Sequence, residues 1–314
     1  MKRVNIIMSS YNGEKYIREQ IESILNQSYK NIKLIVRDDG SKDGTVDILR
    51  EYEAAGKIKL YVGKNVGFIK SFHWLICHAG EADYYAFADQ DDVWLQNKIE
   101  IAVDRLEQEE FFINFGKGEE TCSKPLLYFS NYNLCDEKLN VIRSAYREDY
   151  VRRTSFANCL VDCASLGFNS VFNRAAKEMM AENPPRCSDG HDWWTYMVCQ
   201  GLGKVIYDPR ITVMYRRCGN NESAGGMSFI KFQIWRIKKF FLNDNCKVIK
   251  GMHREYARLY RDKLSKEDRE LLLLFARKKY NLIAAIKKAT YKKRYREKLF
   301  DEISVRILLL FGKI

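Results

Sequence analysis

Proline is scarce in this sequence, and a long apolar run is missing. Only 4 of the 314 residues are proline, which leaves little material for long flexible linkers. No apolar run approaches the roughly 18 residues of a membrane-spanning helix, and segment 1–8 turns polar too early for a signal peptide. With 46% hydrophobic and 30% charged residues, the composition is that of a globular protein with a sizeable core.

Paired cysteines are missing as well. The nine cysteines are odd in number and scattered, and no Cys-x-x-Cys pair occurs among them. Cys159 and Cys163 could share one helical turn, but no second Cys or His pair at zinc spacing completes a metal site. We therefore expect reduced, buried thiols in a cytosolic protein.

Basic and acidic residues are distributed unevenly. Residues 228–314 hold 24 basic and 9 acidic side chains, a net charge of +15, whereas residues 1–227 hold 29 and 32, a net charge of −3. A basic segment of this kind suits an anionic surface, either lipid head groups or nucleic acid, and a solvated basic face is the alternative. Because no nucleic-acid-binding motif accompanies the charge, nucleic acid is not expected as a partner.

Short β-rich runs alternate with helical stretches over the first hundred residues. The pattern predicts alternating strands and helices at 4–9, 14–26, 32–37, 43–54, 57–62, 68–78, 84–88 and 95–109. Repeats of this length require right-handed crossovers and a mostly parallel sheet with helices on both faces. An α/β fold of the Rossmann-like type is therefore expected.

The alternation is less regular after residue 124. Strands are expected at 126–131, 204–207 and 211–216 and helices at 173–181 and 191–200, whereas 149–166 is ambiguous. After residue 226 the composition changes to basic helices. The predicted organisation is an α/β domain over residues 1–226 and a basic helical region over residues 227–314.

A polar cluster follows each of the first four predicted strands. The clusters are Ser9 to Asn12, Asp38 to Ser41, Asn65 to Gly67, and Asp89 to Asp92. Ligands of open α/β sheets bind beyond the carboxyl ends of the strands. The four clusters therefore predict one site on one edge of the sheet.

Three acids lie within four residues at the fourth strand end. Asp89, Asp91 and Asp92 would repel one another unless a cation intervened. One or two such carboxylates together with a substrate diphosphate form a usual site for Mg²⁺ or Mn²⁺. The alternative is that Asp89 and Asp91 only cap the helix that follows.

Two further positions carry candidate chemistry. Asp39 could accept hydrogen bonds from a nucleobase while Tyr11 offers a flat ring for stacking, although the Asp38 to Thr45 segment could be only a turn and helix cap. Asp192, at a predicted helix start beside Trp193 and Trp194, suits a general base next to an apolar sugar face. The alternative is Asp192 as a helix cap, with both tryptophans in the core.

The motifs occur in a fixed order over residues 1 to about 226. They are Met8 to Gly13 with Tyr16, Gln20 to Ile24 with Gln27 and Ser28, Arg37 to Thr45, Asn65 to Gly67, Asp89 to Trp94 with Lys98, His191 to Trp194, and Tyr215 to Arg217. This series resembles the GT-A type, family 2 glycosyltransferases, and within them the bacterial rhamnosyltransferase-like members of polysaccharide assembly. The resemblance is highly specific for the family and much less so for the sugar.

The resemblance implies roles for the matching residues. Ser10, Tyr11, Asn12, Glu14, Asn65, Gly67 and Gln90 would line the nucleotide-sugar pocket, Asp39 would face the base, Asp89 would approach the ribose, Asp91 would hold Mg²⁺ or Mn²⁺ on the diphosphate and Asp92 would support that loop. Asp192 would deprotonate the acceptor hydroxyl, with His191, Trp193 and Trp194 in support. The implied reaction is a single displacement that inverts the anomeric carbon.

One position departs from the family pattern. Nearby members commonly carry Tyr-Arg-x-His-x-x-Asn after the last short strand, whereas this chain has Cys218 in place of the histidine. A role for that imidazole at the metal or diphosphate is therefore in doubt, and Arg216 or Arg217 is the expected replacement at the phosphate. The resemblance favours dTDP-rhamnose as donor, with a UDP-hexose as the alternative, and a glycan or lipid-linked oligosaccharide as acceptor.

The end of the chain carries a four-residue repeat. Tyr291, Tyr295, Leu299, Ile303, Ile307 and Phe311 recur every four residues, and five basic residues lie between positions 292 and 298. This pattern predicts a basic amphipathic helix at a membrane interface, and Leu271 to Ile286 indicates a similar helix before it. Packing against the body of the protein is the alternative for both. The expected location is cytoplasmic, peripheral on the inner face of the cell membrane.

Two other function classes compete with the sugar transferase. A sugar-nucleotide pyrophosphorylase would need a glycine-rich phosphate loop near the N-terminus, but Ser9 to Gly13 has only one glycine. A non-catalytic partner subunit would have no need of Asp91, Asp92 and Asp192, all of which are present.

Overall fold

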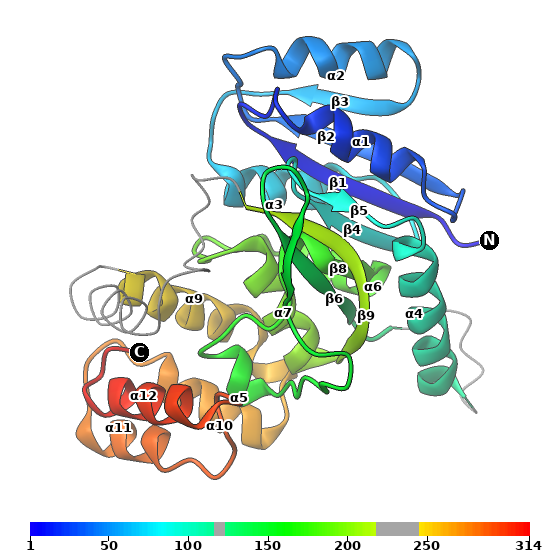
Figure 1. Ribbon diagram of the computed structural model, residues 1–314. Coiled ribbons are helices and arrows are strands. Elements are labelled where there is room, and N and C mark those ends of the chain that lie inside the picture. The colour runs from blue at the N-terminus through cyan, green and yellow to red at the C-terminus, as the bar shows by residue number, and fades with distance from the viewer. Residues whose placement is uncertain (116–122, 218–244) are drawn as a thin grey trace. The chain divides into compact units, whose positions relative to one another are not determined.

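Nine strands of the described residues join in one sheet (Figure 1). The structure is a computed structural model that describes residues 1–115, 123–217 and 245–314. The strands follow in the order β3 (Ile58–Val62), β2 (Ile32–Asp38), β1 (Val4–Ser10), β4 (Tyr84–Ala88), β8 (Ser170–Asn173), β6 (Leu126–Cys135), β9 (Lys204–Arg216) and β5 (Val93–Trp94), and β7 (Val141–Ser144) pairs with β6.

The first four strands are parallel, as the alternation of elements predicts. Ser10 lies opposite Asp38 in the pair β1 and β2, and Asp38 lies opposite Val62 in the pair β2 and β3. Met8 lies opposite Ala88 in the pair β1 and β4. All four strands therefore end at the same edge of the sheet, and the polar clusters that follow them start there.

Helices cover both faces of this sheet. Alternate strand residues pack with α1 (Ile17–Leu25), α2 (Thr45–Ala54) and α4 (Lys98–Asn114) in one apolar cluster. On the other face Phe72 of α3 (Phe68–His78) contacts Phe87 of β4, and α6 (Arg174–Glu182) packs on α3. The predicted α/β fold is confirmed, and α3 and β4 have the predicted bounds.

The second half of the sheet contains antiparallel pairs. β8 runs antiparallel to both β4 and β6, and neither β8 nor β7 is among the predicted strands. The two strands predicted at 204–207 and 211–216 are one strand, β9, whose register against β6 shifts between Asp208 and Ile211. Pro209 lies at this irregularity, where a missing N–H group is tolerated.

The chain divides into two compact units. Unit 1 comprises 1–152, 165–184 and 203–218 and contains the whole sheet, whereas unit 2 comprises 153–164, 185–202 and 219–314. Segments 153–164 and 185–202 therefore belong with the C-terminal helices. The functional division at residue 226 stays a prediction, and this packing division does not coincide with it.

Unit 2 is helical in its described residues. Its helices are α5 (Phe156–Cys159), α7 (His191–Leu202), α9 (Asn245–Tyr260), α10 (Lys266–Phe275), α11 (Leu282–Ala289) and α12 (Leu299–Leu310), with a short 3-10 turn at Arg261–Lys263; a second such turn, Gly167–Asn169, lies in unit 1. Buried aromatic rings hold the helices together, and the ring centroids of Trp194 and Tyr256 lie 5.8 Å apart.

Asn158 of α5 joins three segments of unit 2. Its side-chain amide donates to the Tyr295 carbonyl at 2.6 Å, and its side-chain oxygen accepts the Tyr196 hydroxyl at 2.7 Å. Tyr196 lies on α7, and Tyr295 lies between α11 and α12. This buried amide therefore connects the segment 153–164 to both α7 and the end of the chain.

The end of the chain differs from the predicted helix. α12 begins at Leu299, and Tyr295, which the four-residue repeat places on the same helix, is buried before it. The basic residues at 292–298 therefore lie in the connection between α11 and α12. The segment 271–286 is likewise two helices, because α10 ends at Phe275 and α11 begins at Leu282. No helix in the described ranges combines the length and apolar composition that a membrane span requires.

Candidate functional site

The loop after β2 is built around Asp38. Its carboxylate accepts the Gly40 and Ser41 backbone N–H groups at 3.0 and 2.8 Å and the Ser10 hydroxyl at 3.0 Å. Gly40 adopts a left-handed φ of +82°, and a side chain there would meet the backbone nitrogen of Asn65 at 3.0 Å. Asp38 therefore ties the ends of β1 and β2 together and keeps this loop close to the one that follows β3.

The loop after β1 is held against the start of α2. The Asn12 backbone N–H group donates to Ser41 Oγ at 2.9 Å, and the Asn12 side chain accepts the Lys42 N–H group at 2.8 Å. Glu14 accepts the Gly44 N–H group at 2.9 Å. Asn12 and Glu14 thus fix the loop, and their predicted contact with a nucleotide stays a prediction.

Asp39 is committed to contacts inside the protein. Its carboxylate pairs with the Arg37 guanidinium at 2.5 Å and accepts the Val66 and Gly67 backbone N–H groups at 3.0 and 2.8 Å. The side chain is buried. A nucleobase that bonded to Asp39 would have to replace one of these donors, so the role of Asp39 at the base stays a prediction. Asn65 and Gly67 are exposed beside it.

Tyr11 has a fixed backbone and an exposed ring. Gln90 accepts the Tyr11 N–H group at 2.8 Å and donates to the Tyr11 carbonyl at 3.0 Å, which joins the loops after β1 and β4. The Tyr11 side chain is 42% exposed. An exposed ring on a pinned backbone is suited to stacking on a flat ligand.

The three acids after β4 lie in an unfavourable electrostatic environment. Asp92 is fully buried, and burial together with the charges of Asp89 and Asp91 raises its pKa well above the ordinary value. Burial also raises the pKa of Asp91, which the charge of Arg216 opposes. A cation at this position would relieve the repulsion, so the donor set fits a divalent metal. Within the described residues, no group of three or more His, Cys, Asp or Glu side chains could hold a metal by itself.

Arg216 holds the acidic loop from the end of β9. Its Nε donates to the Asp91 carbonyl at 2.8 Å, and its backbone N–H group donates to Asp92 Oδ1 at 3.0 Å. The guanidinium also bonds to the Glu137 carbonyl and the Glu19 carboxylate and lies over the Tyr16 ring. Arg216 is buried among these partners and supports the loop, and its expected place at a phosphate stays a prediction.

Lys98 is a second buried cation near this loop. It is fully buried, its Nζ lies 4.5 Å from the centroid of the Trp94 ring, and burial lowers its pKa to about 7 against the opposing charge of Asp92. The motif in which it lies could be found in the sequence. The burial of Lys98 could not be predicted from the sequence. The contacts of Glu19 and Glu137 with Arg216 could not be predicted either, because these two residues come from distant segments with no motif of their own.

Asp192 lies in the first turn of α7 in unit 2, at the predicted helix start. Its carboxylate accepts the Trp193 N–H group at 2.8 Å. Trp194 is fully buried, so the core alternative holds for this tryptophan, while Trp193 donates from Nε1 to the Cys159 carbonyl at 2.7 Å. Burial lowers the pKa of His191 to about 3, which keeps that imidazole neutral.

The structure thus brings most of the predicted residues to one place. At the carboxyl edge of β1 to β4 in unit 1, Ser10 ends β1, and the loops that follow the strands carry Tyr11, Asn12, Glu14, Asp39, Asn65, Gly67, Asp89, Gln90, Asp91 and Asp92. We call these loops, residues 10–14, 38–45, 63–67 and 89–92, the loop edge. Arg217 follows β9, and its backbone N–H group donates to the Cys135 carbonyl. Cys218 lies outside the described residues.

Two bacterial proteins are similar to this chain in sequence. The chain is 30% identical over 234 residues to an uncharacterized glycosyltransferase of Haemophilus influenzae, covering 70% of this chain and 67% of that protein. It is 29% identical over 237 residues to a dTDP-rhamnosyl transferase, RfbG, of Shigella flexneri, covering 71% and 75%.

Two solved structures have a similar fold. One is S. aureus TarS in complex with UDP-GlcNAc, with a TM-score of 0.59, 13% identity and coverage of 99% of this chain and 79% of the other. The second is a mannosyltransferase from Pyrobaculum calidifontis in complex with GDP-Man and Mn²⁺, with a TM-score of 0.50, 17% identity and coverage of 99% and 86%.

The family itself is identified from the sequence. Residues 5–176, more than half of the chain, match Glycosyl transferase family 2. This segment contains β1 except its first residue, β2 to β4 and the whole loop edge. The chain belongs to the family 2 glycosyltransferases, enzymes that transfer a sugar from a nucleotide-sugar donor.

Proposed function

We propose that the protein is an inverting, metal-dependent glycosyltransferase of cell-surface polysaccharide synthesis. It moves a sugar, with rhamnose from dTDP-rhamnose as the first choice, to a hydroxyl of a glycan or lipid-linked oligosaccharide. The observation that carries this proposal is the convergence of an exposed ring, a clamped Asp39 and three acids on one edge of a parallel sheet. We assign the transferase domain to 1–226 and the basic helical region to 227–314.

The donor site lies on the loop edge in this proposal. Tyr11 stacks on the base, and Ser10, Asn12, Asn65 and Gly67 line the pocket with Glu14, Gln90, Asp39 and Asp89. The fixed hydrogen bonds of Asp38 and Gln90 support such a site, because they set the loop positions before a ligand arrives.

Asp91 is the residue that we propose to hold Mg²⁺ or Mn²⁺. The cation would neutralise charge on the leaving diphosphate. Asp92 and Arg216 act on the same loop by holding its backbone. The raised pKa of Asp92 supports the assignment, because the charges of Asp89 and Asp91 contribute to it after burial, and neighbouring carboxylates repel one another unless a cation intervenes.

Asp192 is the proposed general base. It takes the proton of the acceptor hydroxyl, whose oxygen forms the new bond to the anomeric carbon while the bond to the diphosphate oxygen breaks. The electron pair leaves with the diphosphate, and one displacement inverts the anomeric carbon. His191, Trp193 and Trp194 position the helix start that carries Asp192.

The relative that is named a dTDP-rhamnosyl transferase supports the choice of donor. A UDP-hexose remains the second candidate, since a fold neighbour binds UDP-GlcNAc. A lipid-linked acceptor would present its hydroxyl at an anionic membrane surface, and residues 228–314 are the proposed contact with that surface. The proposed location of the enzyme is therefore the inner face of the cell membrane.

Calorimetric binding of dTDP, UDP and GDP tests the donor site. We expect binding of dTDP that requires Mn²⁺ and is lost with chelator and in Asp91→Asn. Preference for UDP would select the second donor class. If a folded protein bound none of the three nucleotides, the assigned site would be wrong.

Turnover separates an enzyme from a non-catalytic subunit. With dTDP-rhamnose and an acceptor, Asp192→Asn should lower kcat about a thousandfold with unchanged dTDP affinity. Asp189→Asn, a change to a nearby acid of the same segment, serves as control. Equal rates for wild type and Asp192→Asn would exclude Asp192 as the base.

A further inference from the structure

The outward face of α12 is apolar. Every residue of this helix that is exposed is large and hydrophobic: Leu299, Phe300, Ile303, Ile307 and Leu310, followed by Phe311. Phe300 is 74% and Phe311 68% exposed. Their spacing of about four residues places them along one side of the helix. A helix in contact with water alone would carry polar residues on this side.

α11 likewise exposes large hydrophobic residues and buries small ones. Ala284, Ala285 and Ala289 face the interior, whereas Leu282, Ile283 and Ile286 are exposed. The two helices pack on each other, and Tyr280 Oη donates to the Leu310 carbonyl at 3.0 Å, so the start of α11 lies beside the end of α12. We call the nine exposed hydrophobic residues of this helix pair, 282, 283, 286, 299, 300, 303, 307, 310 and 311, the apolar face.

Basic residues lie at both ends of this helix pair. Segment 277–279 precedes α11, and segment 292–298 connects α11 to α12. The Lys292 side chain is largely exposed, although it and Lys293 also contact Glu267. The arrangement of a hydrophobic surface between cationic ends is typical of a helix that lies at a membrane interface.

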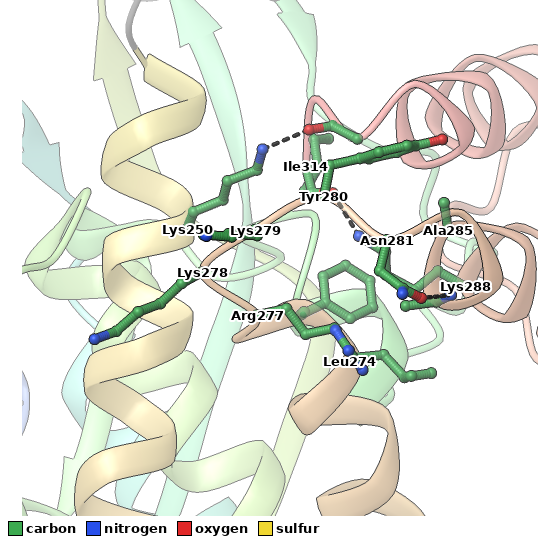
Figure 2. Close-up of a pocket in the computed structure, with 13 residues that line it drawn as sticks. Lys250, Leu274, Arg277, Lys278, Lys279, Tyr280, Asn281, Ala285, Lys288 and Ile314 are labelled. Carbon is green, nitrogen blue, oxygen red and sulfur yellow. Dashed lines mark hydrogen bonds between the residues drawn. The ribbon is translucent and has the colours of Figure 1, made fainter.

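A cationic pocket opens at one end of the pair (Figure 2). Its cavity volume is about 40 Å³, and five basic residues but no acidic side chain line it: Lys250, Arg277, Lys278, Lys279 and Lys288. Lys250 and Lys288 already donate to the main-chain oxygens of Gly312 and Ile314. Gly312, which directly follows Phe311, also lines the pocket. The pocket therefore lies next to the end of the apolar face. In a phospholipid, the phosphate group likewise lies next to the acyl chains.

We propose that the apolar face and this pocket dock the protein on an anionic phospholipid bilayer. The apolar side chains enter the boundary of the acyl chains, and Lys278 and Lys279 of the pocket bind lipid phosphates. A second copy of the chain would cover the same apolar face but would bring like basic clusters together, whereas an anionic bilayer neutralises them. The biological use of this surface rests on the proposed function, since it would bring the enzyme to a lipid-linked acceptor.

Flotation of the full chain with vesicles tests the surface. We expect binding to phosphatidylcholine vesicles that contain phosphatidylglycerol and little binding to phosphatidylcholine alone. Ile303→Glu with Ile307→Glu should lower the partition coefficient about a hundredfold. The control is Val141→Glu with Ile142→Glu on β7, where both residues are more than half exposed. This control should change partitioning less than about twofold.

Charge reversal in the pocket is the second part of the vesicle experiment. Lys278→Glu with Lys279→Glu should lower partitioning about tenfold at low salt, and Lys57→Glu with Lys59→Glu, two exposed lysines of unit 1, should not. Phe300→Ser with Phe311→Ser replaces the first variant if that variant does not fold. Nucleotide binding is measured on the same samples, so loss of vesicle binding and loss of the donor site are distinguished.

Three outcomes would overturn the proposal. The first is that the wild-type protein does not bind anionic vesicles, or that the variants of the apolar face bind vesicles as strongly as their control does. The second is a dimer in sedimentation equilibrium that Ile303→Glu with Ile307→Glu converts to monomer, which would make the face a contact between copies. The third is binding of inorganic phosphate to the pocket, lost in the Lys278 and Lys279 variant, without vesicle binding.

Discussion

The loop edge of unit 1 buries charged side chains, whereas the apolar face of unit 2 exposes hydrophobic ones. Asp39, Asp92 and Lys98 are all buried on or near the loop edge. On α12, by contrast, most of the Phe300 side chain is exposed. Both regions depart from the usual distribution of polar and apolar residues, in opposite directions.

The two departures are compensated differently. At the loop edge, Arg37 pairs with the buried carboxylate of Asp39, whereas Asp92 Oδ2 and Lys98 Nζ are buried with no hydrogen-bond partner among the described residues. The hydrophobic side chains of the apolar face are exposed in the part of the chain that the structure describes. A buried charge with partners indicates a site organised before its ligand binds, and an exposed apolar face indicates a surface completed by what it contacts.

The largest effect on the free energy of unfolding is expected from breaking the buried ion pair between Arg37 and Asp39 at the loop edge. Asp39→Asn removes the carboxylate that faces Arg37, whose side chain is 7% exposed, and leaves a buried guanidinium without its counter-charge. We expect the free energy of unfolding to fall by about 4 kcal/mol, measured by urea denaturation. Asp149→Asn, which breaks an exposed pair with Arg147, should cost less than about 0.5 kcal/mol. Similar costs for the two variants would contradict a preorganised loop edge.

A pair of substitutions on α12 tests whether the apolar face lies outside the core. Leu309 is fully buried, so Leu309→Ala should lower the free energy of unfolding by about 3 kcal/mol. Ile307 is 44% exposed, and Ile307→Ala should change it by less than about 0.5 kcal/mol. Thermal or urea unfolding without lipid measures both. An equal loss in the two variants would mean that folding itself buries the apolar face.

The parallel half of the sheet is predictable from the sequence because each element carries its own local pattern. The strand Tyr84–Ala88 and the helix Phe68–His78 have the bounds that the hydrophobic pattern predicts. β8 is not predictable in this way, since it is a four-residue strand that is held by antiparallel partners on both sides. Pairing between distant segments leaves little signal in the sequence.

The site and the chain end show the same limit. The motifs identify the loop edge, but only the structure shows that the Arg216 side chain donates hydrogen bonds to Asp91, Glu137 and Glu19. The four-residue repeat is right for the exposed stripe of α12 and wrong for Tyr295, which is buried before the helix starts. A repeat shows which residues share a side, and packing decides whether that side is covered.

A smaller effect on stability is expected from a fall in pH, through a buried histidine of unit 2. Burial lowers the pKa of His253 to about 3, and its Nε2 contacts the Leu160 carbonyl at 2.8 Å. The unfolded chain takes up a proton below about pH 6.5, and the folded chain does not until about pH 3, so stability falls as the pH falls through this window. At pH 5 this histidine should cost about 2 kcal/mol.

His253→Gln removes this titration while keeping an amide donor for the Leu160 carbonyl. Urea unfolding at pH 7.5 and pH 5 should show a smaller loss of stability in the variant than in wild type, by about 2 kcal/mol. Equal losses in both proteins would mean that His253 is protonated in the folded state.

The smallest effect tests whether the two regions act separately. Tyr11 is an exposed ring like those of the apolar face, but Gln90 pins its backbone at the loop edge. Tyr11→Ala should weaken dTDP binding about tenfold through lost stacking, and Tyr11→Phe should keep the affinity within about twofold. Because the ring does not join the core, the free energy of unfolding should change by less than about 0.5 kcal/mol. Vesicle flotation of Tyr11→Ala should match wild type, just as the Ile303 and Ile307 variant should keep its affinity for dTDP. If either variant impaired both activities, the nucleotide site and the lipid surface would be coupled, and the comparison between two independent regions would fail.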